Sequence, residues 1–202
     1  MKKFSIVIII AVAAILVYSY WPEKELQHQP GVLCPDDPGQ TTVVNPASWE
    51  KDEYTITPLA EFKIKAFVLS TNSFSVGKES DLSPMDLALG WGQMSNQVIV
   101  DGLDISQSNR WYRWKADHLI IPASEIMTHS SNMHIIPAND EVEETLDKLY
   151  KGCIIEMKGY LVSVKGKDGW HWKSSLRRDD TGGGACELVW AEELSIVEGG
   201  DE

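Results

Sequence analysis

The chain opens with an almost unbroken run of apolar residues. Residues 4–21 contain only two serines as ordinary polar residues, and a helix of that length reaches about 27 Å, enough to span a bilayer core. Lys2 and Lys3 precede the run, aromatic residues including Trp21 close it, and Pro22 stops the helix. We expect residues 1–3 to stay cytoplasmic, residues 4–21 to cross a bacterial inner membrane once, and the remainder to be periplasmic.

The alternative for the same run is a cleaved signal peptide. Val17 and Ser19 are small enough to precede a cut at Tyr20, and a cut there leaves a secreted or freely periplasmic protein. No polar region separates the apolar run from that point, so we favour the retained anchor.

The distribution of prolines indicates where the folded domain begins. Residues 22–48 hold five of the nine prolines and few large apolar residues. We therefore predict a stiff tether that does not pair in a sheet. One folded domain is expected over residues 49–197, followed by a polar tail at 198–202.

Within the domain, apolar and polar residues alternate along residues 61–69, which is typical of a half-buried strand. Residues 98–100, 103–105 and 111–114 have β-type composition, and we predict strands there. Later strands are expected at 154–164, 170–172 and 186–196, the first of them bent at Gly159.

Two helices are predicted from capping signals. Asp140–Lys151 places apolar residues at i, i+4 and i+7 behind the cap residue Asn139. The spacing Ser83-Pro-Met-Asp86 resembles a capping box with proline at the first helical position, and predicts a short helix ending near Gly90.

Several short strands with one well-capped helix predict a mainly β (α+β) domain, preceded by the N-terminal transmembrane helix. The favoured architecture is a small β-barrel that resembles the oligonucleotide/oligosaccharide-binding (OB) type, with one packed helix. A β-sandwich with a helix at its side produces a similar pattern and stays open as the alternative.

Charge narrows the choice of partners. The chain carries 18 basic and 30 acidic residues, a formal net charge of −12. Such a chain is a poor match for nucleic acid. Basic residues with interleaved aromatics do gather between 148 and 178, but acidic residues dominate 179–202 and can neutralise them. A protein partner or an envelope glycan fits better, and no cofactor is predicted.

Three cysteines suit an oxidising compartment. A disulfide between Cys153 and Cys186 is one interpretation, because closing a loop of about 33 residues stabilises by about 3–4 kcal/mol. The other interpretation is that both are small buried apolar residues.

Two motifs carry little weight. Asp180-Thr-Gly182 matches the aspartic-protease triplet, but polar turn-formers surround it and predict a loop. His129 and His134 lie five residues apart, which is not the spacing of a helical ligand pair, so no metal site is predicted.

Seven of the eight tryptophans lie in the expected domain, which is many for one domain, and polar residues gather beside some of them. The candidate binding residues are Arg110, Asn132, Trp172 and Ser174. The candidate catalytic residues are His134, Arg177 and Asp180.

Four stretches of the chain, residues 90–95, 105–114, 130–138 and 172–187, resemble a group of uncharacterised bacterial membrane-anchored proteins. The resemblance implies an envelope setting. It brings no activity and no catalytic residue.

Together these patterns favour a membrane-anchored periplasmic module that binds a protein partner or an envelope glycan. The alternative is a nuclease-like periplasmic hydrolase with His134 as base and Arg177 stabilising a developing anion. That alternative requires His134, Arg177 and a carboxylate such as Asp180 to meet in one cleft. A structural subunit of a membrane complex is a third possibility.

Overall fold

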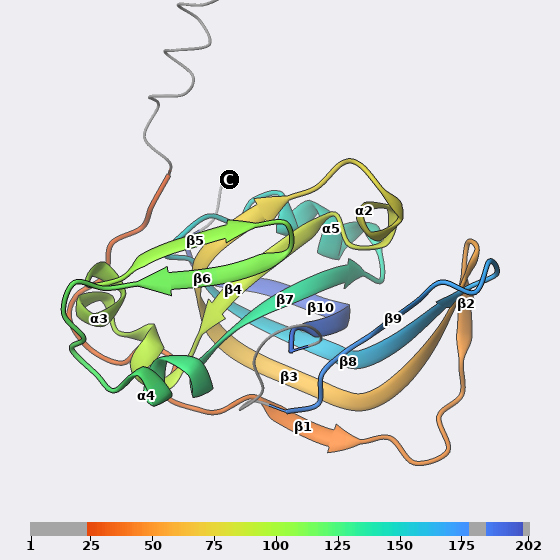
Figure 1. Cartoon of the computed structure of the whole chain (residues 1–202), viewed down its shortest axis with the longest axis horizontal. Coiled ribbons are helices and arrows are strands. Elements are labelled where there is room, and N and C mark those ends of the chain that lie inside the picture. Colours follow the sequence, from red (N-terminus) through yellow and green to blue (C-terminus); the bar gives the residue numbers. More distant parts are fainter. Residues whose placement is uncertain (1–23, 178–184, 200–202) are drawn as a thin grey trace, which may run out of the picture.

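The computed structural model describes residues 24–177 and 185–199, and the fold in these ranges is mainly β (Figure 1). Its strands are β1 (Gly39–Thr42), β2 (Trp49–Lys51), β3 (Tyr54–Ser73), β4 (Met85–Gly90), β5 (Asp104–Ser108), β6 (Trp111–Lys115), β7 (Ser130–Pro137), β8 (Ile154–Gly166), β9 (His171–Lys173) and β10 (Glu187–Glu198). Its helices are α2 (Lys78–Leu82), α3 (Gln97–Asp101), α4 (Ala123–Thr128) and α5 (Asp140–Leu146), with a 3-10 turn η1 (Gly92–Ser95). A mainly β chain was predicted correctly. Two helices were expected in the domain, and the described residues contain several short ones.

Five strands of one continuous sheet form a closed ring in the order β3–β4–β7–β10–β8 and back to β3. Neighbours are antiparallel except β7 and β10, which are parallel. The ring closes because β3 is long: residues 54–67 pair with β8, and residues 67–73 pair with β4. Register shifts at Pro58/Ala60 and Val68/Ser70 bend the strand, and Pro58 has no N–H to give to the ladder.

The interior of the ring is apolar. Phe62, Ile64 and Ala66 of β3 point inward, as their alternation with polar residues predicted. Facing them are buried side chains of the other strands, among them Leu87, Leu89, Met133, Ile135, Met157, Leu161 and Val189. Full burial of side chains of this size contributes about 1.5–3 kcal/mol each, so this core is the main source of stability.

A second apolar cluster lies on other faces of the same strands. Its buried members are Ile56, Leu82, Ile136, Val162, Val164, Leu188 and Trp190, and half-buried aromatics including Trp49, Tyr54, Trp170 and Trp172 pack against it. Strands that are buried on both faces read as continuous apolar runs rather than alternating ones.

That double burial explains one wrong prediction. Residues 85–90 were expected as a short helix, but they form β4, and all six are buried. Asp86 does not complete a capping box; it pairs with His134 in the register of β4 with β7. The strand predicted at residues 98–100 was also wrong, because these residues belong to α3. The Asn96 side chain caps the first turn of this helix by accepting a hydrogen bond from Val98 N at 3.2 Å.

Other local predictions are confirmed. α5 begins after Asn139, whose Oδ1 accepts from Val142 N at 3.0 Å. β6, β8, β9 and β10 all fall within two residues or so of the strands expected there. Gly159 of β8 pairs with Ala191 of β10, next to a register shift between Ala191 and Glu193. This irregularity agrees with the bend that was predicted at Gly159.

The predicted tether is packed on the ring from residue 24 onward. Cys34 is only 1% exposed, and its N–H and that of Leu33 donate to Ser95 Oγ at 2.9 and 3.1 Å. β1 pairs with β3, which corrects the expectation that this segment stays out of the sheet. The prolines do not prevent pairing, because they fall outside β1.

Within residues 24–177 and 185–199, no helix combines the length and apolar character that a membrane crossing needs. The anchor predicted at residues 4–21 lies outside these ranges.

Candidate functional site

Arg110 lies at the tip of a hairpin that crosses the outside of the ring. Strands β5 and β6 pair from Asp104↔Lys115 to Ser108↔Trp111, leaving Asn109 and Arg110 as a two-residue turn. Both turn residues have positive φ, 52° and 62°. Two positive φ values mark a type I′ turn, which favours Asn-Gly, so an arginine here costs about 1–2 kcal/mol of backbone energy. Contacts of its side chain offset that cost.

The Arg110 guanidinium binds several groups at one end of the ring. Nη1 donates to Asp86 Oδ1 at 2.7 Å, Nη2 donates to the Ser83 carbonyl at 2.9 Å, and Nε lies 3.3 Å from Glu79 Oε2. Its Cζ lies 4.1 Å from the centre of the Phe74 ring. The arginine side chain is 11% exposed, so these contacts are largely shielded from water.

Asp86 connects Arg110 to His134. The carboxylate is 1% exposed, and its Oδ1 also lies 2.8 Å from His134 Nδ1. This contact is electrostatic rather than a well-aligned hydrogen bond, since His134 Nδ1 satisfies no hydrogen-bond geometry. The histidine ring packs on Trp172, with 4.8 Å between centroids. A buried carboxylate needs such partners, because desolvation costs it several kcal/mol.

Asn132 ties the hairpin to β7. Its Nδ2 donates to the Arg110 carbonyl at 3.1 Å and to Asp86 Oδ2 at 3.4 Å, and its Oδ1 accepts from Gln107 Nε2 at 2.6 Å. We call this group the Arg110 cluster: Phe74, Glu79, Asp86, Gln107, Arg110, Asn132, His134 and Trp172.

The structure thus brings together four sequence candidates, Arg110, Asn132, His134 and Trp172. Ser174 is buried and forms hydrogen bonds with backbone groups. Its Oγ donates to the Ser175 carbonyl at 2.7 Å and accepts from Leu188 N at 3.0 Å.

The described residues do not include the whole candidate catalytic set. Arg177 is exposed, and its N–H donates to Ser175 Oγ at 3.0 Å, whereas His134 is buried against Asp86 and Trp172. Asp180 and the triplet that it begins lie outside the described residues.

Sequence reasoning missed Asp86, which is the centre of the cluster. A single carboxylate inside the apolar run Met85–Gly90 was the available signal, because a charge at such a position has to be paired if the segment is buried. It was instead assigned to a helix cap.

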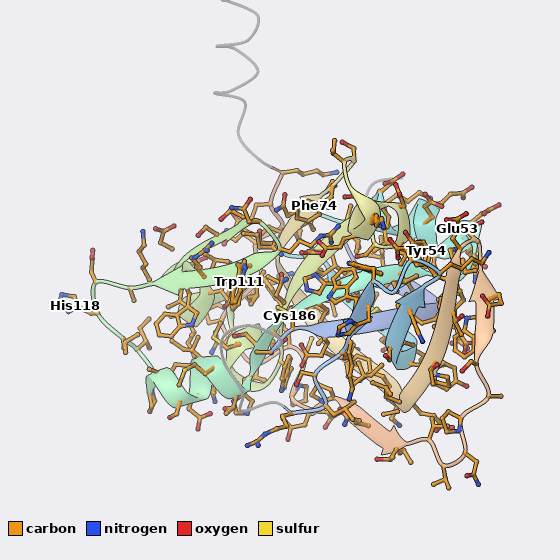
Figure 2. The ribbon with its side chains drawn as sticks, turned by 45° about the vertical axis from the view of Figure 1, so that its right-hand side comes forward. Glu53, Tyr54, Phe74, Trp111, His118 and Cys186 are labelled. Atoms are coloured by element: carbon orange, nitrogen blue, oxygen red, sulfur yellow. The ribbon has the colours of Figure 1, made fainter. Side chains whose placement is uncertain are left out.

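An open pocket of about 430 Å³ lies beside the cluster, between β6, α4, the first residues of β7 and the start of β10. We call it the Trp111 pocket; its lining includes Trp111, Tyr112, Trp114, Arg113, Lys115, Met127, Ser130, Ser131, Asn132 and Cys186. Trp111 is 41% exposed, and Figure 2 shows it close to Cys186. The described lining combines three aromatic side chains with hydroxyl and amide groups and two cations.

Tyr112 is held at the base of this pocket. Its hydroxyl lies 3.3 Å from Ser130 Oγ, and burial raises the pKa of Tyr112 to about 12. The side chain therefore presents a neutral hydroxyl at any physiological pH.

A second hollow, of about 410 Å³, lies on the other side of the hairpin tip. Asn109 and Arg110 line it together with Phe74, Lys78 and Trp170. Lys78 forms an exposed ion pair with Asp168, and that bond raises the pKa of Lys78 and lowers the pKa of Asp168. The two hollows are separated by the tip of the hairpin.

The cysteines are thiols in this structure. Cys153 is fully buried in the ring core, while Cys186 Sγ lies 4.0 Å from the Arg110 carbonyl. The bridge that was one of the two interpretations is not formed. β8 and β10 are antiparallel with Ile154 paired to Glu198, so Cys153 and Cys186, which precede these strands, lie at opposite ends of the pair. Burial raises the pKa of the third thiol, Cys34, to about 11.

Comparison of the chain with protein-family models, with curated protein sequences and with solved structures finds no match in any of the three.

Proposed function

We propose that this protein is a membrane-anchored periplasmic module that binds an envelope glycan in the Trp111 pocket. The observation that carries the proposal is the pocket itself, with an exposed tryptophan at its rim and hydroxyl, amide and cationic groups around it. Periplasmic location rests on the apolar run at residues 4–21.

The order of the strands in the ring supports our proposal that the fold is an OB-type barrel. In chain order its strands are β3, β4, β7, β8 and β10; the fifth pairs between the third and fourth, and α5 connects the third to the fourth. OB barrels bind oligosaccharides or oligonucleotides on the face of their second and third strands, flanked by the connections 1–2 and 4–5.

In this chain that face belongs to β4 and β7. Residues 74–84 are the first–second connection, and Trp170 and Trp172 belong to the fourth–fifth connection. Asp86 of β4 and Asn132 and His134 of β7 belong to the Arg110 cluster, and residues of the cluster line both hollows. Strand order by itself specifies no ligand, because one fold hosts many functions, so the ligand class has to come from the side chains.

The side chains favour a sugar with acidic groups. Tryptophan and tyrosine supply flat apolar area that binds with little loss of rotamer entropy, and Ser130, Ser131 and Asn132 supply hydrogen-bonding groups for hydroxyls. Arg113 and Lys115 add positive charge at the edge of the pocket on a chain that is otherwise acidic. Carboxylate-bearing glycans fit this local combination. The overall charge opposes every polyanion, and it disfavours nucleic acid most because nucleic acid carries a charge on each phosphate.

The contacts of His134 support binding over hydrolysis. Its side chain is 5% exposed and lies between Asp86 and Trp172, so a substrate has little access to it. Arg177, the other residue of the hydrolase alternative, is exposed, and its N–H donates to Ser175 Oγ.

The test is a titration of the full-length chain in mild detergent. The acidic probe is a soluble glycan strand of alternating N-acetylglucosamine and N-acetylmuramic acid, and the neutral probe is a chito-oligosaccharide of the same length. Calorimetry and tryptophan fluorescence should show saturable binding that is stronger for the acidic strand. Absence of saturable binding to both probes refutes the proposal.

Variants locate the site. Trp111→Ala should weaken binding about tenfold, because losing one stacking aromatic costs about 1–2 kcal/mol. Val44→Ala is the matched control, since Val44 is 81% exposed between β1 and β2. The same samples are assayed for new reducing ends, which hydrolysis of the glycan would produce. New reducing ends in the unaltered chain that are absent in His134→Ala favour the hydrolase alternative instead.

A further inference from the structure

A separate polar hollow lies where the described chain begins. It has a volume of about 580 Å³ and is lined by Lys24, Leu69, Ser70, Thr71, Ser73, Ile105, Tyr150 and Lys151. We call it the Lys24 hollow. It shares no residue with the Trp111 pocket.

The chemistry of the hollow suits a phosphate group. Two lysines, two serines, a threonine and a tyrosine are among the described residues that line it, and no carboxylate is among those described residues. Ser70 and Thr71 are half-buried, and in the part of the chain that the structure describes their hydroxyls make no hydrogen bond with protein. Partly buried hydroxyls beside ammonium groups can donate to the oxygens of an anion, and lysine is a common phosphate ligand.

The two lysines are held in place by neighbours. Lys24 Nζ lies 4.3 Å from the centre of the Tyr150 ring, and Lys151 Nζ lies 2.8 Å from Glu25 Oε1. Glu25 offsets part of the charge of Lys151, but it does not line the hollow. Among the described residues, the lining is therefore cationic and partly preorganised.

The position of the hollow points to the membrane as the source of the phosphate. Leu26 N donates to the Lys151 carbonyl at 2.9 Å and His28 Nε2 lies 2.7 Å from the Gly152 carbonyl, so the chain is fixed to the domain from its first described residues. Figure 1 shows this end of the chain at the edge of the molecule above β5.

The predicted anchor ends at Trp21, three residues before Lys24. An extended chain covers about 3.5 Å per residue, so three residues span at most about 10 Å between the end of the predicted anchor and the hollow. Headgroup phosphates of the outer leaflet lie at that distance from the hydrocarbon core.

From these observations we propose that the Lys24 hollow binds the phosphate of an anionic phospholipid, and that this contact holds the domain in one orientation on the membrane. The inference does not depend on the proposed glycan site. It needs the apolar run to stay in the membrane.

The test uses the full-length chain in nanodiscs that contain phosphatidylcholine alone or mixed with phosphatidylglycerol. Native mass spectrometry after release counts retained lipids of each kind. Phosphatidylglycerol should be retained in preference to phosphatidylcholine, and Lys24→Gln should lower its retention about fivefold, the effect expected of one lysine at a lipid surface.

Two further variants separate this effect from misfolding. Ser70→Ala together with Thr71→Val keeps the strand and removes the hydroxyls, and it should lower retention while leaving circular dichroism unchanged. Lys165→Gln is the control, because Lys165 is exposed on β8 and does not line the hollow. Equal retention in all variants, or no preference for phosphatidylglycerol, overturns the proposal.

Free phosphate is the competing source of the same chemistry. Inorganic phosphate is titrated into the chain in a phosphate-free detergent, with and without Lys24→Gln. Binding that depends on Lys24, combined with lipid retention that does not, assigns the hollow to a soluble phosphate and overturns the lipid proposal.

Discussion

Replacing Arg110 by alanine tests whether the Arg110 cluster holds the hairpin on the ring. The change leaves the Asp86 carboxylate, which is 1% exposed, without its guanidinium partner. Removing one member of a buried ion pair costs about 3–5 kcal/mol, since the remaining charge stays desolvated. The backbone strain at φ 62° stays, because alanine has the same Cβ as arginine.

The assay is thermal unfolding of the full-length chain in mild detergent, followed by tryptophan fluorescence. For a domain of this size, 1 kcal/mol corresponds to about 2–4 °C, so Arg110→Ala should lower Tm by about 6–20 °C. Arg113→Ala is the matched control: it is on the same hairpin and exposed, with Nη1 donating to Ser108 Oγ at 2.7 Å. Its loss should cost less than about 1 kcal/mol.

The double variant Asp86→Asn/Arg110→Ala separates charge from packing. Removing the carboxylate as well takes away the unpaired charge, so the double variant should recover part of the stability that Arg110→Ala loses. The reasoning is refuted if Arg110→Ala loses no more than Arg113→Ala, or if the second change gives no recovery.

Three other predictions follow from single residues. Between pH 10 and 12 the folded state keeps the Tyr112 proton that the unfolded chain loses. The free energy of unfolding should therefore fall by about 2–3 kcal/mol as pH rises through this window. Unfolding measured across this range should show no such fall from this group in Tyr112→Phe. Gly159→Ala should cost about 3 kcal/mol or more of stability, because a Cβ there meets the Trp190 carbonyl oxygen. Gly169→Ala has open space around it and should cost about 1–2 kcal/mol, because its φ is 89°. Urea unfolding measures both free energies, and equal losses of stability contradict the steric argument. Alkylation of Cys186, which lines the Trp111 pocket, should be slowed by a saturating acidic glycan, as measured by mass spectrometry of the peptide; an unchanged rate places the glycan elsewhere.

Local patterns predicted the elements whose signals are local. The strand at residues 61–69 was found because one face of it is apolar and the other polar, and α5 was found because Asn139 caps a helix with the correct period. β4 was missed for the opposite reason: both of its faces are buried, so no alternation is visible, and its first residues imitate a helix cap.

The candidate site was only partly predictable. Polar residues near tryptophans led to Arg110, Asn132, His134 and Trp172 as separate candidates, and the sequence contained no information on their mutual distances. The Asp86 position was not predicted, because its role depends on a residue 24 positions away in the chain.

By itself, the sequence determined the apolar run at residues 4–21, the β-rich composition and the acidic charge, since each of these is a property of neighbouring residues or of their sum. Tertiary structure decided the closure of the ring, the packing of residues 24–48 on it and the assembly of the Arg110 cluster. The physical reason is that these features rest on pairing between distant segments, where strand register and burial select which charges meet.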